Sequence, residues 1–594
     1  MKSFVTIIAT LVVAGVVIGA GMYLAAPALM TQIGGMARNY LLTLSAPAGT
    51  LTVDSNPSYI APGDAMPLPA AAALSPEAAA DWPSYNRTPS SDRYSPLKQI
   101  NKTNIAALKV LCTYDVGGFD AFESGLLMVD DALIATTEFD ILSLNPANCA
   151  LNWRTHEDYP RNIKPANRGA AYLDGMLFRG TQDGRVLAYD FRTGERLWAT
   201  RIADPKLGES VPAAPIAWDG LVFIGNSGGD FKGGKGHMFA LDAKTGRIVW
   251  EFFLAPKTAN DPVLGPEGKT PLDMSTWNNV SDIPISGAGT WTSFTLDVKT
   301  GALYVPGGNP APDFAVDVRE GGNLYSDSVV VLDAETGDYR YHYKLVPRDW
   351  HDWDASNPPV LVQTMGAKRL LVIAPKDGHL YGFDLDDNNR LLYRVRVTRI
   401  ENVDEPFVVG KDVHFCPGAV GGGEWNSPSF VPESNLILVG EVEWCDTVRL
   451  EDVSRLRAKG LGEPWAGMAT LNPFWTLVRE RKSDGTWAGW VYAVDADTGV
   501  WKWRLKSNYP IVGGVTPTAG GIAFVGDVGG NFYALDTANG QKLWSGQLGG
   551  AIGGGVITYA TQGVQRVAVA IGFTHVAWPT KIVTPKIVVL GLPE

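Results

Sequence analysis

The sequence has few of the residues that build zinc sites, haem attachment sites or basic surfaces. It contains only 4 Cys and 7 His among 594 residues, and no CxxC, CxxCH or HExxH motif occurs. This excludes a Cys-rich zinc fold, a covalently attached haem and a zinc hydrolase of the HExxH type. Charged residues make up only 19% of the chain, and the formal net charge is -12. Because the chain has no basic excess, we expect no nucleic acid as a partner.

Glycine, proline and tryptophan are, by contrast, abundant. The chain has 66 Gly, 39 Pro and 19 Trp, and 45% of its residues are hydrophobic. Gly and Pro break helices, whereas large aromatic side chains fill cores. This composition therefore predicts a globular protein built mainly from short strands and turns.

An uncharged run of 27 residues occupies positions 4–30, preceded by Lys2. It is long enough to cross a bilayer as a helix and longer than the core of most cleaved signal peptides. We therefore expect residues 1–32 to form one N-terminal transmembrane helix, with a cleaved signal as the alternative. Lys2 predicts a cytoplasmic N-terminus and an exported body, and the Ala- and Pro-rich residues 33–80 are typical of a tether.

The four cysteines fall into two local pairs. Cys112 and Cys149 are 37 residues apart, and Cys416 and Cys445 are 29 apart. If the body is exported to an oxidising compartment, two disulfides are expected. Four buried free thiols are the alternative.

One short pattern recurs along the chain: apolar residues, Asp or Asn, a turn that usually contains Gly, and then an aromatic residue. The copies are LSLNPANCALNW (142–153), LAYDFRTGERLW (187–198), FALDAKTGRIVW (239–250), VVLDAETGDYRY (330–341), YGFDLDDNNRLLY (381–393), YAVDADTGVWKW (492–503) and YALDTANGQKLW (533–544). Each copy predicts a hairpin, because Asp or Asn caps turn amides and Gly accepts positive φ.

The spacing of these hairpins predicts the whole fold. Most copies lie 41 to 52 residues apart, which is room for four strands per unit. The longest gap, from Asp384 to Asp495, has room for further strands and a loop insertion. A last set of strands lacks its own turn and would be completed by a strand near residues 108–114. We therefore expect an all-β fold, an eight-bladed β-propeller over residues 81–594.

The repeated hairpin resembles the tryptophan-docking motif of the pyrroloquinoline quinone (PQQ) dehydrogenases, and the segment DWPSYNRTPSSDRYSPLKQINKTNIAALKV (81–110) resembles the start of their propeller. The resemblance covers residues 81–594. It implies that PQQ lies on the ring axis beside a metal ion, with Ca2+ expected and a lanthanide or Mg2+ possible.

The resemblance also nominates a base and metal ligands. Asp352, in PRDWHDWD (347–354), matches the catalytic base, which also faces the cation. Asn309 in GGNPAPDF and Asp230 in GNSGGDF match metal ligands, and Asp354 matches the additional carboxylate of lanthanide-using members. Carboxylate and amide oxygens are the ligands that hard cations prefer. Turn capping is the alternative role for Asp352, Asp354 and Asn309.

Five further residues match cofactor contacts of the family. They are Glu123 at the cofactor rim, Arg168 and Lys376 as cations for an anionic cofactor, Ser227 as a polar contact, and Trp291 as the indole that stacks on the quinone. The alternatives are an ion pair between Arg168 and Asp230, a core position for Trp291 and a solvated turn for Lys376.

The resemblance implies a quinoprotein dehydrogenase in the bacterial inner membrane, with one membrane span and its catalytic body in the periplasm. It would oxidise an alcohol, polyol or sugar hydroxyl to a carbonyl and pass electrons to membrane quinone or cytochrome c. Asn162 and Ile163 stand where alcohol-oxidising relatives carry adjacent cysteines, which favours a polyol or sugar. The alternative function is a non-catalytic propeller scaffold of the cell envelope.

Overall fold

The computed structural model describes residues 51–55, 80–118, 121–160, 166–271, 274–280, 282–468, 488–575, 578 and 580–593. The expected membrane span in residues 1–32 lies outside this part of the chain, as does all of the expected tether except 51–55 and residue 80. Among the described helices, none combines the length and the apolar character needed to cross a bilayer.

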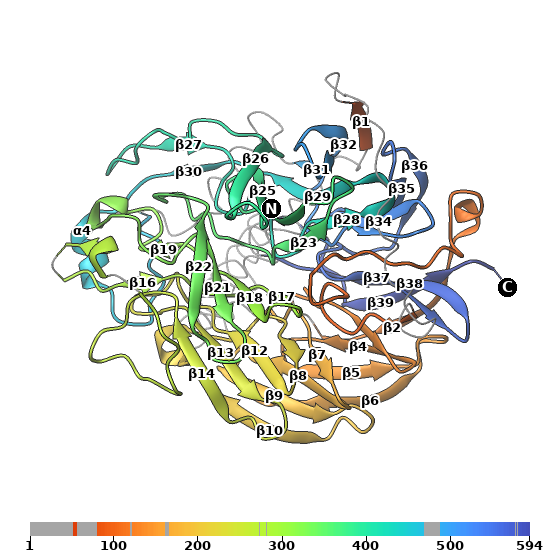
Figure 1. Cartoon of the computed structure of the whole chain (residues 1–594), viewed down its shortest axis with the longest axis horizontal. Coiled ribbons are helices and arrows are strands. Elements are labelled where there is room, and N and C mark those ends of the chain that lie inside the picture. Colours follow the sequence, from red (N-terminus) through yellow and green to blue (C-terminus); the bar gives the residue numbers. More distant parts are fainter. Residues whose placement is uncertain are drawn as a thin grey trace, which may run out of the picture.

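Eight antiparallel sheets of at least four strands follow one another around a ring in the described residues, as the sequence predicted (Figure 1). The first three blades are β3–β6 (Leu127–Val129, Ala132–Thr136, Asp140–Leu144, Leu151–His156), β7–β10 (Ala171–Leu173, Met176–Gly180, Arg185–Asp190, Arg196–Arg201) and β11–β14 (Ile216–Trp218, Leu221–Gly225, His237–Asp242, Ile248–Phe253). The next two are β17, β18, β21 and β22 (Thr295–Asp297, Ala302–Pro306, Ser328–Asp333, Tyr339–Lys344) and β23–β26 (Val360–Gln363, Arg369–Ile373, His379–Asp384, Arg390–Arg396).

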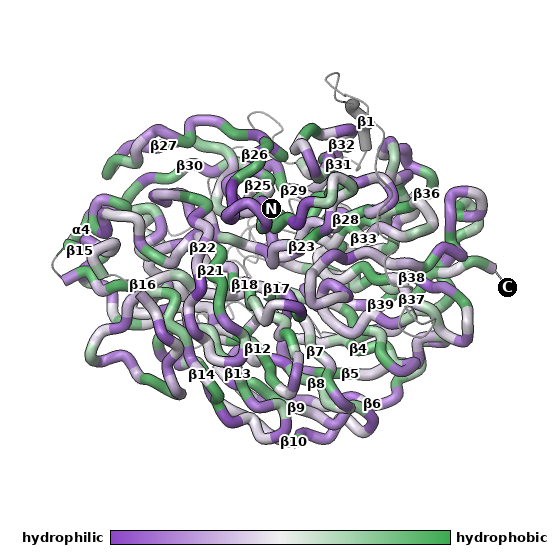
Figure 2. Tube along the Cα trace, viewed as in Figure 1, coloured by the Kyte–Doolittle hydropathy of each residue, from purple (hydrophilic) through white to green (hydrophobic). Residues whose placement is uncertain are grey.

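The sixth and seventh blades are β28, β29, β31 and β32 (Ser429–Val431, Leu436–Glu443, Ala488–Asp495, Trp501–Ser507) and β33–β36 (Thr516–Pro517, Ile522–Gly526, Asn531–Asp536, Lys542–Gln547). Strand β1 (Leu51–Ser55) adds to the outer edge of the sixth blade by pairing with β32. The inner strands are largely buried, and in several blades, such as those of β6 and β10, the outer strand alternates between exposed and partly buried residues. Hydrophobic and hydrophilic segments are accordingly interspersed around the whole ring (Figure 2).

The eighth blade closes the ring with a strand from the other end of the propeller. It contains β37, β38 and β39 (Val556–Thr561, Val564–Ile571, Lys586–Gly591), and β2 (Lys109–Asp115) pairs with β39 as the sequence predicted. A disulfide with an S–S distance of 2.07 Å joins Cys112 on β2 to Cys149 in the β5–β6 turn. Because this bond links the eighth blade to the first, it holds the closure covalently. The second expected disulfide, Cys416–Cys445, is also present.

The repeated hairpins join each blade to the next. Five indole N–H groups donate to a backbone carbonyl of the neighbouring unit: Trp153 to Phe191 at 3.1 Å, Trp198 to Ala243 at 2.9 Å, Trp250 to Ala334 at 2.9 Å, Trp503 to Thr537 at 2.9 Å and Trp544 to Leu108 at 3.1 Å. The turn glycine of the next hairpin packs against the indole of the docking tryptophan. A Cβ on Gly337, for example, would approach Trp250 Cδ2 to 2.6 Å, so this glycine is required by packing as well as by its φ of 73°.

Short elements also occur in the segments outside the blade strands. They are the short pairs β15–β20 (Asn278–Asn279, Arg319–Glu320), β16–β19 (Ser286–Gly287, Pro310–Ala311) and β27–β30 (Val413–Phe415, Asp446–Val448), helix α4 (Val453–Ala458), and the 3-10 turns Ile105–Ala107, Pro205–Leu207, Met274–Thr276, Val316–Val318 and Pro432–Ser434. The gap from Asp384 to Asp495 holds the inner strands of the sixth blade plus some of these short elements, and no additional blade in its described residues.

Candidate active site

A cavity of about 410 Å³ lies where loops from successive blades converge. Its lining residues adjoin the inner strands of the blades, which places it at the ring axis. Eight of the nine nominated residues line it: Glu123, Arg168, Ser227, Asp230, Trp291, Asp352, Asp354 and Lys376. The ninth, Asn309, is not among the lining residues, but its backbone N–H donates to Asp354 Oδ1 at 3.1 Å. The nominations therefore describe one place in the fold.

Asp354 is held by several donors. Lys376 Nζ lies 2.5 Å from Asp354 Oδ2, and Trp291 Nε1 donates to Asp354 Oδ1 at 3.0 Å. Gly308, in the GGNPAP segment, makes room for this carboxylate, because a Cβ at this position would lie 2.5 Å from Asp354 Oδ1. Both oxygens of Asp354 thus have protein partners inside the cavity wall.

Asp352 differs from Asp354 in its backbone conformation and in the pKa of its carboxyl. Its φ of 66° lies in the left-handed region, which Asp tolerates better than most residues. Lys376 Nζ is 3.6 Å from Asp352 Oδ1. Burial raises the pKa of Asp352 well above its ordinary value; Lys376 opposes the shift and Asp354 adds to it. Burial alone would lower the pKa of Lys376, but Asp352 and Asp354 raise it well above its usual range.

Arg168 provides the second cation. Its Nη2 atom forms an ion pair with Glu123 Oε2 at 2.7 Å, and its Nη1 atom donates to the carbonyl of Trp291 at 3.0 Å. Its guanidinium lies over two indoles, 4.6 Å from the Trp291 ring centre and 5.1 Å from that of Trp425. Lys376 Nζ is 5.6 Å from the Trp291 ring centre. Trp291 is therefore part of the cavity wall and a contact for both cations.

Ser227 and Asp230 come from the glycine-rich loop after β12. Ser227 Oγ lies 2.8 Å from Ser210 Oγ, and the carbonyl of Asp230 accepts from the backbone N–H of Trp465 at 2.8 Å. Gly228 has a φ of 115°, and a Cβ there would lie 2.8 Å from Glu209 Cα. Only glycine fits this crowded, left-handed position, so the course of the loop depends on this residue.

Sequence reasoning missed three further buried carboxylates in the lining: Asp313, Glu424 and Asp446. Glu424 Oε1 has no hydrogen-bond partner among the described residues. Burial raises the pKa of Glu424 to about 8, with Lys376 opposing the shift and Asp354 adding to it. The glycine run before Glu424 was the signal in the sequence that could have located this residue. A Cβ on Gly423 would lie 1.9 Å from the carbonyl oxygen of Ala374. Such a run indicates a backbone pressed against another strand.

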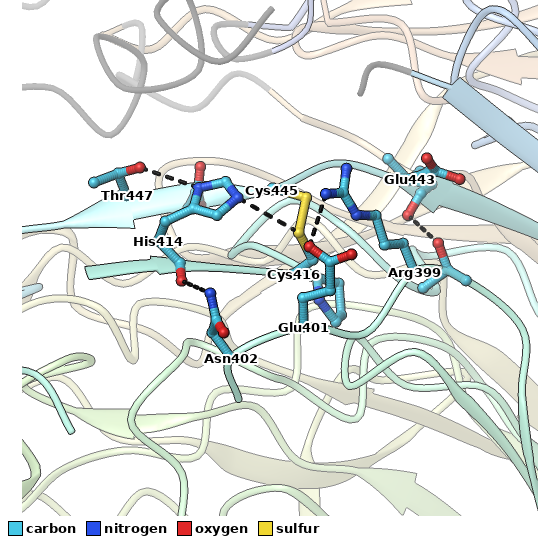
Figure 3. Close-up of a disulfide and its surroundings, with 12 residues drawn as sticks. Arg399, Glu401, Asn402, His414, Cys416, Glu443, Cys445 and Thr447 are labelled. Atoms are coloured by element: carbon cyan, nitrogen blue, oxygen red, sulfur yellow. Dashed lines mark hydrogen bonds and ion pairs between the residues drawn. A yellow bond between two sulfur atoms is a disulfide. The ribbon is translucent and has the colours of Figure 1, made fainter. Parts of the chain in front are cut away.

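The nominated metal ligands are oxygen donors, which fits a hard cation. Within the described ranges, the only three His, Cys, Asp or Glu side chains whose ligand atoms lie within 4.8 Å of one another are His414, Cys416 and Cys445. The two cysteines form a disulfide beside His414, so this group is not a metal site (Figure 3). The disulfide instead joins two segments that continue into the cavity wall at Ala419 and Asp446, where the Ala419 N–H donates to Asp446 Oδ2 at 2.8 Å.

Comparison with known proteins gives a consistent result. The profile of the family "Glucose/ethanol/alcohol dehydrogenase, beta-propeller domain" (PQQ) matches residues 82–391, and that of "Outer membrane protein assembly factor BamB" matches residues 488–571. The dehydrogenase subunit of a quinone alcohol dehydrogenase from Komagataeibacter europaeus is 29% identical over 546 residues, which cover 83% of this chain and 71% of that protein.

A lanthanide-dependent methanol dehydrogenase from Methylacidiphilum fumariolicum (strain SolV) is 28% identical over 514 residues, covering 80% of this chain and 82% of that protein. Among solved structures, a quinohemoprotein alcohol dehydrogenase from Pseudomonas putida HK5 superposes with a TM-score of 0.78 at 25% identity, covering 86% of this chain and 80% of the other. A europium-containing methanol dehydrogenase gives a TM-score of 0.76 at 24% identity, covering 86% and 98%.

Proposed function

The chain belongs to the PQQ-dependent glucose/ethanol/alcohol dehydrogenase family, and from this premise we propose that it oxidises the hydroxyl of an alcohol, polyol or sugar to a carbonyl in the axial cavity. The observation that carries the proposal is the cavity itself, which collects two cations, an indole face and several buried carboxylates around about 410 Å³. No structural role requires so many charged side chains to converge on one hollow.

The donor set fits PQQ and a hard cation. Arg168 and Lys376 would bind an anionic cofactor, Trp291 would pack against a flat ring, and Ser227 and Glu123 would contact its polar rim. Asp230, Asn309, Asp352 and Asp354 offer carboxylate and amide oxygens for Ca2+ or a lanthanide. Bound there, PQQ supplies a two-electron acceptor and the cation a Lewis acid.

Asp352 is the proposed catalytic base. It faces the cavity, and its carboxylate has 19% of its side-chain surface exposed, against 4% for Asp354. Asp354 is engaged by Lys376, Trp291 and the Asn309 N–H, so Asp352 is the member of the pair that can reach a substrate. It would accept the hydroxyl proton, while Lys376 holds both carboxylates in place.

We propose an alcohol, a polyol or a sugar as the substrate. Asn162 and Ile163, which favour a polyol or sugar, lie outside the described residues. The relatives named above are alcohol and methanol dehydrogenases, which supports a hydroxyl substrate in general. We propose that electrons leave to membrane quinone or cytochrome c, because the printed sequence contains no CxxCH haem motif.

We also propose a periplasmic body held at the inner membrane by one N-terminal helix. The uncharged run at 4–30 supports the anchor, and the two disulfides support an oxidising compartment.

The competing function is a propeller scaffold. The match to the assembly factor covers only residues 488–571, a stretch that contains none of the nominated site residues. That match reports the shared repeat, whereas the dehydrogenase match at 82–391 contains all nine nominated site residues. The enzyme is therefore the better supported function.

The deciding experiment is reconstitution. The purified protein is mixed with PQQ and either Ca2+, Mg2+ or a lanthanide, and bound quinone is measured by its absorbance. Dye reduction is then followed across a panel of alcohols, polyols and sugars. We expect uptake of PQQ and metal-dependent dye reduction. A protein that takes up no PQQ with any metal is not a quinoprotein dehydrogenase.

A further inference from the structure

A buried glutamate that does not line the cavity lacks a hydrogen-bond partner for its side chain among the described residues. Glu441 on β29 is 0% exposed, and neither of its carboxyl oxygens has a hydrogen-bond partner among the described residues. Such groups are rare in folded proteins and call for an explanation. Its neighbour Glu443, two residues along the same strand, shows the ordinary solution: its Oε2 accepts from Trp490 Nε1 at 2.5 Å.

Three backbone segments meet beside Glu441. The Gly422 N–H donates to the carbonyl of Val442 at 2.8 Å, and the Val442 N–H donates back to Gly422 at 3.0 Å. The Gly423 N–H donates to the carbonyl of Pro375 at 3.2 Å. Glu424, Glu441 and Asp377 therefore each lie within two residues of one shared hydrogen-bonded contact. Glu424 is the member that lines the cavity.

Asp377 connects this contact to the outer strand of its blade through hydrogen bonds. It is 3% exposed, and its Oδ2 accepts from Tyr381 Oη at 2.5 Å. His379 Nδ1 lies 3.0 Å from the same oxygen, and Arg394 Nη2 lies 3.2 Å from His379 Nδ1. Arg394 is on the outer strand β26, with 52% of its side-chain surface exposed. Glu424, which lines the cavity, and Asp377, whose partner His379 has 16% of its side-chain surface exposed, both interact electrostatically with Glu441.

We propose that Glu424, Glu441 and Asp377 form a proton exit path from the axial cavity to the partly exposed His379 on β25. The proposal rests on the dehydrogenase function. Oxidation of a hydroxyl to a carbonyl removes two protons and two electrons from the substrate. When the two electrons leave to the external quinone or cytochrome, two protons must also leave the cavity. A quinone acceptor takes up two protons, and a cytochrome leaves them in solution, so the balance holds for either acceptor.

The pKa of Glu441 is shifted in the direction that a proton relay requires. Burial raises the pKa of Glu441 well above its ordinary value, and Asp377 and Glu424 raise it further. Tyr492 on the paired strand β31 also interacts with Glu441, as it does with Glu443. A carboxyl with a raised pKa holds its proton to higher pH than an ordinary glutamate, so it can serve as a proton donor as well as an acceptor. Buried oxygens without protein partners are ordinarily bonded by internal water, which bridges gaps between such groups.

The test separates proton release from electron transfer. The full chain, loaded with PQQ and Ca2+ and reduced by substrate, is mixed with an artificial acceptor in stopped flow, and a pH-indicator dye reports proton release. We expect Glu441→Gln to bind PQQ with unchanged affinity but to release protons on the order of tenfold more slowly, with a larger solvent deuterium isotope effect. Asp377→Asn provides a second interruption of the path and should slow release similarly.

The matched control is Glu443→Gln, the same substitution on the same strand, which should leave the rate of proton release unchanged. Infrared spectra of the apoprotein provide a readout that is independent of turnover: Glu441→Gln should remove a carboxylic acid band present in the wild type. If the wild type turns over and Glu441→Gln releases protons at the wild-type rate, the path is wrong and the function stands. If the wild type binds no PQQ, both are wrong.

Discussion

Asp190 and Asp242 at the rim of the ring and Asp352 at its axis have opposite properties. Asp242, in a docking hairpin, accepts from the backbone N–H and the hydroxyl of Thr245, both at 2.8 Å. The hydrogen bond from the Thr245 hydroxyl lowers the pKa of Asp242. Burial opposes this shift, and the turn amides add to it. Asp190 in the preceding hairpin behaves in the same way. At the axis, burial raises the pKa of Asp352 well above its ordinary value.

The difference shows how to separate structural from functional carboxylates in one molecule. The Asp242 carboxylate accepts three hydrogen bonds from its own turn, so its charge is stabilised and its role is to hold the turn. An axial carboxyl is desolvated and faces like charges, which costs free energy that no turn requires. Substitutions in the two regions should therefore fail in different ways, with lost chemistry at the axis and lost stability at the rim.

The largest effect should come from Asp352→Asn. The amide keeps the size of the side chain but cannot accept a proton, so we expect turnover to fall on the order of 1000-fold, equivalent to about 4 kcal/mol in the barrier. The measurement is kcat of the PQQ-loaded enzyme, with PQQ affinity and thermal unfolding as controls. Full turnover in this variant would show that another group is the base.

Trp250→Ala should have the next largest effect, this time on stability. The indole is 2% exposed, donates to Ala334 and packs against Gly337, so its loss should cost about 3 kcal/mol of unfolding free energy. Urea unfolding measures this cost. Trp250→Phe keeps most of the packing and should cost about 1 kcal/mol for the lost hydrogen bond. Equal losses in both variants would mean that packing contributes little.

Glu441→Gln tests the axial side of the comparison through pH. The pKa of Glu441 is raised in the folded protein, so between the ordinary glutamate value of about 4.3 and the folded value the folded state binds more protons than the unfolded state. The stability of the wild type therefore falls as pH rises through this window, by up to about 1.4 kcal/mol for each pH unit. Glu441→Gln has no carboxyl at this position, so its stability does not fall with pH for this reason.

The melting temperature of Glu441→Gln should accordingly exceed that of the wild type by an amount that grows with pH above about 4.3. Glu443→Gln on the same strand is again the control. A constant difference at all pH values would contradict a raised pKa at Glu441.

The sequence predicted the rim better than the axis, for physical reasons. The hairpins are local: Asp242, the Thr-Gly turn and Trp250 lie within twelve residues and repeat, so pattern alone predicts them. Closure by residues 109–115 followed from a unit that lacked a strand. The cavity residues were assigned by resemblance, and the structure brings them together. Glu424 and Glu441 were missed because their desolvation arises from contacts between segments far apart in the chain.

The smallest effect should be that of Asp242→Ala at the rim. Removing the carboxylate leaves the turn amides of Lys244 and Thr245 without their side-chain acceptor, but these amides are exposed and water replaces it. We expect a loss of about 1 kcal/mol in unfolding free energy and no change in PQQ affinity. Asp242→Asn keeps an acceptor oxygen and should lose less. Because a rim carboxylate acts through hydrogen bonds to one turn, a change in PQQ affinity in either variant would mean that rim and axis are coupled, and the division between structural and functional carboxylates would fail.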